Sequence, residues 1–124
     1  MTDPLPEDIR QFVLDHVDSI AEMEALVMLT RESDRSWPLE QVVARLYIAP
    51  ADAERTLERL RSAGLAERGA EGWRAATVGG PRAGTLARLV ELYATHLIPI
   101  TNLIHGKSSR IRQFADAFQL RKKD

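Results

Sequence analysis

The chain has 124 residues, of which 44% are hydrophobic and 28% charged, and its formal net charge is −1. These values predict one soluble globular domain spanning residues 1–124. The sequence contains no cysteine, which excludes disulfide bonds, thiolate metal sites and cysteine nucleophiles. No segment reaches the roughly 20 apolar residues of a membrane span. The acidic start, "MTDPLPEDIR", also lacks the features of a secretory signal. We therefore expect a cytoplasmic protein that makes no membrane contact.

The charge is unevenly distributed along the chain. Residues 1–40 carry a net charge of −7, residues 41–80 carry +1 and residues 81–124 carry +5. The basic part either contacts a polyanion or contacts the acidic front of the same or another subunit, unless both surfaces are simply solvated. The basic side chains at the end of the chain are Lys107, Arg110, Arg112, Arg121, Lys122 and Lys123.

Two amphipathic segments at the start of the chain predict helices. The first covers 6–17, begins with a proline followed by two acids, and carries apolar residues at helical spacing. The second covers 20–32 and follows "SIAE", which matches a capping box. In such a box Ser19 caps free backbone N–H groups and Glu22 reaches back to Ser19.

Two further helices and a hairpin follow. The segment 38–46 begins with proline in "WPLEQVVARLY", and "YIA" joins it to a helix at 50–63 that also begins with proline. Gly64 is suited to ending that helix. Beyond it, "LAERGAEGWRAA" changes to a period of two around a glycine-bounded turn, which predicts a β-hairpin.

The last part of the chain is predicted to be helical. Apolar residues keep one helical phase across 85–104, and Pro99 lies inside this stretch. Since the phase survives across the proline, we expect a kink there rather than a break. The segment "SRIRQFADAFQL" predicts a last short helix, so that flanking helices extend over 85–120.

The stretch 20–76 resembles a winged helix-turn-helix domain. The resemblance is carried by "EALVMLTRES", "PLEQVVARLYIAPADAERTLERLRSAGLAER" and "GWRAA". The flanking helices at 6–17 and 85–120 are similar in general layout to the dimer-forming helices of multiple-antibiotic-resistance-type regulators. We therefore expect a mainly α fold with a small β-hairpin wing. This fold serves DNA reading and protein contact alike.

The resemblance implies a DNA-binding transcriptional regulator whose helix at 50–63 lies in the major groove, with the wing on the backbone or minor groove. Arg55 and Arg59 are four residues apart and share a helix face, and either can pair with guanine. Arg61 and Arg74 are placed to contact phosphates. The candidate DNA-contacting residues on double-stranded DNA are Ala51, Asp52, Arg55, Arg59, Arg61 and Arg74.

The charges of the same helix support an alternative. Asp52 and Arg55 are three residues apart, as are Glu58 and Arg61, so both pairs can form ion pairs on a solvated surface. Acidic side chains facing phosphates oppose the counterion release that drives DNA binding. The wing tip, "GAEG", carries Glu71 where a minor-groove probe would use arginine or lysine. The alternative is a winged-helix module that binds a protein partner and no DNA.

The helix at 85–104 predicts a homodimer. Between Leu86 and His105 its only formal charges are Arg88 and Glu91. A helix this apolar is buried on more than one side, and the second side is either another subunit or the helix at 6–17 of the same chain. The candidate dimer residues are Leu86, Leu89, Val90, Tyr93, Leu97, Ile100 and Ile104.

No pattern in the sequence indicates catalysis. The HExxH motif, a phosphate-cradling glycine loop and a nucleophile elbow are all missing from the sequence. His96 and His105 are nine residues apart, out of phase on a helix, so they do not converge on one metal ion. We expect a protein that is not an enzyme and that has no catalytic residues, metal or cofactor.

Overall fold

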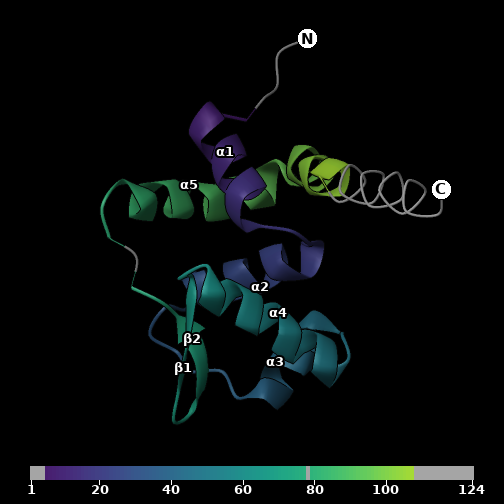
Figure 1. Cartoon of the computed structure of the whole chain (residues 1–124), viewed down its shortest axis with the longest axis vertical. Helices are drawn as coiled ribbons and strands as arrows, with labels where there is room; N and C mark the ends of the chain where they lie inside the picture. The colour runs from purple at the N-terminus through teal and green to yellow at the C-terminus, as the bar shows by residue number, and fades with distance from the viewer. Residues whose placement is uncertain (1–4, 78, 108–124) are drawn as a thin grey trace, which may run out of the picture.

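The computed structural model of the chain describes residues 5–77 and 79–107. A further helical stretch follows the named elements at 97–107. Figure 1 shows two layers: α1, α5 and this last stretch lie on one side of α2, and α3, α4 and the hairpin lie on the other. The elements in chain order are α1 (Glu7–His16), α2 (Ile20–Arg31), α3 (Leu39–Leu46), α4 (Pro50–Ser62), β1 (Ala66–Gly69), β2 (Gly72–Ala75) and α5 (Pro81–Thr95).

The fold is mainly α with a small β-hairpin wing, as the sequence predicts. The ends of α1 to α4 each lie within one residue of their predicted positions. Local signals explain this agreement: proline is the first residue of α4 and precedes α3, and acids occupy the first turn of α1.

The capping box at the start of α2 is confirmed, with one difference. Ser19 Oγ accepts a hydrogen bond from the Glu22 backbone N–H at 3.1 Å, and the Ser19 hydroxyl donates to Glu22 Oε2 at 3.2 Å. Glu22 Oε1 accepts from the backbone N–H of Asp18, also at 3.1 Å, and not from that of Ser19. The box therefore holds both the first turn of α2 and the connection that precedes it.

The helix α2 forms the centre of the core. It packs against α3, α4, α5 and β2. A helix enclosed on so many sides is apolar around most of its circumference, whereas the sequence predicts an amphipathic helix here. Its buried residues are Glu22, Met23, Ala25, Leu26, Val27, Met28 and Leu29.

The hairpin is anchored to the connection between α2 and α3. The antiparallel strands β1 and β2 pair Ala66 with Ala75. Next to them, Trp37 and Trp73 exchange two backbone hydrogen bonds of 2.7 and 2.8 Å. Gly72 makes this approach possible: its φ is +136°, and a Cβ there would lie 2.3 Å from the Trp37 carbonyl oxygen. The wing is thus held in place by backbone contacts.

The prediction for the last long helix was wrong in two respects. The helix α5 begins at Pro81 rather than at residue 85, and it ends at Thr95. The helix is broken at His96, with φ −124° and ψ 41°, and resumes at 97–107. A continuous helix would push the ring of Pro99 against the Thr95 carbonyl, while in the first turn of a new helix the proline is tolerated. The predicted helix "SRIRQFADAFQL" lies outside the described residues.

Candidate functional site: the outer face of α4 and the wing

The turn between α3 and α4 consists of residues 47–49 and leaves one face of α4 exposed. Tyr47 ends α3 in the left-handed conformation, with φ 56° and ψ 45°, and its backbone N–H donates to the Val43 carbonyl at 2.9 Å. Its side chain is 92% exposed. The face of α4 that packs into the core contains Ala53, Thr56, Leu57 and Leu60.

All six candidate DNA-contacting residues are exposed. The structure brings five of them together on α4 and places Arg74 on the wing strand β2. The wing and α4 also share a contact that the sequence did not indicate, since Arg68 Nη1 lies 3.8 Å from Glu54 Oε1. The outer face of α4 and the hairpin therefore form one surface.

Ion pairs neutralise most of this surface. The two pairs expected from the sequence are present: Arg55 pairs with Asp52, and Arg61 Nη2 lies 2.8 Å from Glu58 Oε2. On the hairpin, Arg74 Nη2 lies 2.7 Å from Glu67 Oε1. These arginine side chains are 53–67% exposed, so their ion pairs are solvated and easily exchanged.

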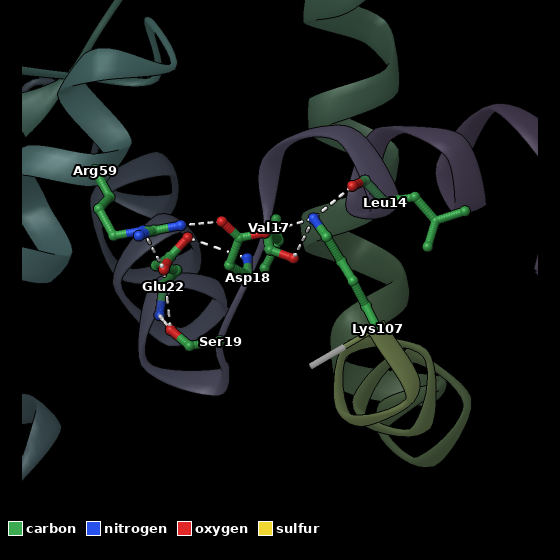
Figure 2. Close-up of polar contacts among 7 residues, drawn as sticks. All are labelled: Leu14, Val17, Asp18, Ser19, Glu22, Arg59 and Lys107. Carbon is green, nitrogen blue, oxygen red and sulfur yellow. Dashed lines mark hydrogen bonds and ion pairs between the residues drawn. The ribbon is translucent and has the colours of Figure 1, made fainter. Parts of the chain in front are cut away.

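Arg59 differs from the other candidates because it points back towards the start of α2. Its guanidinium group contacts Asp18, and its Nε lies 3.1 Å from Glu22 Oε2. Figure 2 shows these contacts together with the capping interactions of Ser19. Glu22 is only 4% exposed, and a buried carboxylate requires a partner. Arg59 therefore serves a structural purpose, which the spacing from Arg55 did not reveal.

The carboxylate of Asp18 also receives a second cation. Lys107, from the last helical stretch, contacts Asp18 and donates hydrogen bonds to the carbonyl oxygens of Leu14 and Val17 (Figure 2). Its ammonium group thus lies at the negatively polarised end of α1. Partial burial alone would raise the pKa of Asp18, but the hydrogen bonds and charges of Lys107 and Arg59 outweigh it and hold this pKa below its usual value.

The candidate dimer residues lie mostly inside the single chain. Six of the seven are buried there, and Leu97 alone is exposed, at 48%. The helix α5 packs against both α1 and α2. Burial, together with the hydrogen bond and charge of Glu24, raises the pKa of Tyr93 above its usual value. The apolar residues of the helix predicted over 85–104 are therefore mostly buried within one chain. Leu97 and its neighbour Ile98, which is 70% exposed, are the exceptions.

Within residues 5–77 and 79–107, no three or more histidine, aspartate or glutamate side chains are grouped so that they could hold a metal ion. Over the same residues, no helix has the length and apolar character needed to cross a membrane.

Comparisons of the chain with protein-family models, with curated proteins and with solved structures found no match. The fold and the surface of α4 define the class of protein. It is a mainly helical protein with an exposed helix after a short turn and a two-stranded wing beside that helix.

Proposed function

We propose that the protein is a cytoplasmic winged-helix transcriptional regulator that binds double-stranded DNA through α4 and the β1–β2 hairpin. The observation that carries this proposal is the free outer face of α4, which presents Arg55 and Arg61 beside a hairpin that presents Arg68 and Arg74. An exposed helix of this kind fits the major groove, and an adjacent hairpin supplies backbone contacts.

The ion pairs on this surface are compatible with the proposal because they are weak. Solvent-exposed pairs contribute roughly 0–1 kcal/mol each, while every phosphate contact releases a condensed counterion. Arg55 and Arg61 can therefore exchange a carboxylate on their own helix for a group on DNA. Arg59 does not belong to this set, since its guanidinium group is engaged by Asp18 and Glu22.

A second candidate function is the binding of a protein partner without DNA. It is favoured by the one-to-one pairing of Arg55, Arg61 and Arg74 with acidic neighbours. A surface of alternating charges is selective for a complementary protein surface, and it has little attraction for a uniformly negative polymer.

The two candidates differ in whether the protein binds DNA. If it does, its DNA affinity should depend on the ion pair between Asp52 and Arg55. Fluorescence anisotropy with a mixed-sequence duplex at low and moderate salt measures this affinity. We expect Arg55→Gln to weaken binding about fivefold or more. We expect Asp52→Asn to strengthen it about two- to fivefold, because the competing carboxylate is removed.

The control for this test is Glu91→Gln, a neutralised acid on an exposed position of α5 in the other layer. It should leave DNA affinity close to that of the wild type, apart from the small general effect of one charge. Absence of binding by the wild type even at low salt would rule out the regulator and leave the protein-binding module.

We also propose that the protein forms a homodimer. After burial of the other candidate residues within one chain, its support comes from the exposed apolar side chains of Leu97 and Ile98 at the break after α5. A second subunit would place two copies of α4 on one duplex, related by a two-fold axis.

A further inference from the structure

A hollow of about 330 Å³ lies beside the connection between α2 and α3. Three of its lining residues, Gln41, Ala44 and Arg45, are three and four apart and so share one face of α3. The other two, Arg35 and Trp37, come from the connection itself. The lining contains two guanidinium groups, an amide and an indole, and no carboxylate. Asp34 and Glu40 are neighbours in sequence but do not line it.

The indole ring of Trp37 positions both guanidinium groups. The Cζ atom of Arg35 lies 3.5 Å from the ring centroid, and that of Arg45 lies 5.4 Å from it. Cation–π contacts of this kind orient an arginine without neutralising it. The ring is 2% exposed, and the backbone of Trp37 is hydrogen-bonded to Trp73. The two arginines are therefore held by a rigid platform rather than by flexible side chains alone.

The two arginines share one carboxylate, which leaves a positive excess. Glu32 Oε1 accepts from Arg35 Nη1 at 3.3 Å, and Glu32 Oε2 lies 3.8 Å from Arg45 Nη2. Arg35 Nη2 also donates to Gln41 Oε1 at 2.9 Å. By contrast, Arg55, Arg61 and Arg74 on α4 and the hairpin each pair with one acid. The lining of the hollow therefore holds two guanidinium groups for one contacting carboxylate.

We propose that this hollow binds a backbone phosphate of DNA and that its two arginines are the main phosphate contacts of the protein. This inference depends on the proposed function. Guanidinium groups bind phosphate oxygens through paired N–H donors, and the phosphate replaces Glu32 as their shared partner. The helix α3, which supplies three of the lining residues, packs directly against α4. Phosphate contacts position a protein on DNA without reading sequence.

The experiment measures the salt dependence of DNA affinity for the variant that carries both Arg35→Gln and Arg45→Gln. We expect weaker binding by about tenfold or more at low salt, to the same extent for duplexes of unrelated sequence, and a salt slope reduced by about one, since one phosphate contact is lost. The matched control is Arg88→Gln on α5, an exposed arginine that pairs with Asp8 in the other layer. It loses one charge and should keep the wild-type slope to within about half a unit.

A second variant guards against loss of folding in the first. Arg45→Gln alone leaves Arg35 stacked on Trp37, and it should weaken DNA binding and lower the slope by less than the double variant does, with a thermal melting temperature close to that of the wild type. If the wild type binds DNA and both variants keep its affinity and slope, the hollow is not the phosphate site, although the proposed function stands. If the wild type binds no DNA at low salt, both proposals are wrong.

Discussion

The side chain of Tyr47 combines backbone strain with near-complete exposure. It is the only residue other than glycine with a positive φ in the described part of the chain, and it is 92% exposed. The left-handed conformation costs a residue with a Cβ about 1–2 kcal/mol, and no burial of the ring offsets this cost. Strain of this kind often persists where function requires it, and the turn between α3 and α4 lies beside the proposed DNA-binding face.

Replacement of Tyr47 should therefore stabilise the protein when the new residue is glycine. We expect Tyr47→Gly to raise the free energy of unfolding by up to about 1 kcal/mol, because glycine adopts this conformation without strain. Urea denaturation measures the change. Tyr47→Ala is the control, since it removes the ring and keeps the strain. If the glycine variant is no more stable than the alanine variant, the left-handed conformation carries no appreciable cost at this position.

At the same scale, the contacts of Arg59 show which part of the site the sequence does not predict. Its spacing from Arg55 places both on one side of an isolated helix and predicts that both read bases. The structure turns Arg59 towards Asp18, which is 41 residues away in the sequence. Such a contact depends on how α4 packs beside the start of α2, and no local pattern encodes it.

At the scale of elements, local signals predicted most of the fold. Prolines, acids in first turns and the capping box fix where α1 to α4 begin, since they act within one turn of the chain. The start of α5 was missed because the apolar residues at helical spacing begin only at Leu86. Gly80, with φ 68°, and Pro81 are the residues that begin the helix. The contact between Trp37 and Trp73 was not predicted, because it joins segments distant in sequence.

The attachment of the wing gives a prediction at this scale. Gly72→Ala should lower the free energy of unfolding by roughly 2 kcal/mol or more, since the residue would be strained at φ +136° and its Cβ would collide with the Trp37 carbonyl oxygen. Gly69→Ala on the other strand is a close control: its Cβ would meet its nearest neighbour at an ordinary 3.8 Å. Thermal or urea denaturation compares the two. Equal losses of stability would show that the contact does not anchor the wing.

At the scale of the whole molecule, the sequence could not decide where an apolar face is buried. The apolar residues of the helix predicted over 85–104 require a partner surface in either case, because their spacing is the same for a core inside one chain and for an interface between two. The structure places Leu89, Ile100 and Ile104 in the same core as Ile9 and Leu26. Burial in one chain was the alternative that the sequence left open, and it accounts for most of these apolar residues.

The two layers of the molecule are joined by ion pairs that meet at Asp18. Arg59 reaches this carboxylate from α4, and Lys107 reaches it from the last helical stretch (Figure 2). Because its pKa in the folded protein lies below the reference value of 3.8, ionised Asp18 stabilises the fold. This contribution is present at pH values above the unfolded-state pKa, and it is lost as the pH falls through the lowered folded-state pKa.

Asp18→Asn should therefore lower the free energy of unfolding by about 1 kcal/mol at neutral pH, the usual scale for a partly exposed ion pair. Urea denaturation from pH 7 into the acid range should show the wild type and the variant converging as Asp18 takes up its proton in the wild type. Asp34→Asn is the control, because the exposed Asp34 side chain has no hydrogen bond or ion pair among the described residues. A wild-type advantage that persists unchanged at low pH would show that the Asp18 charge does not join the layers.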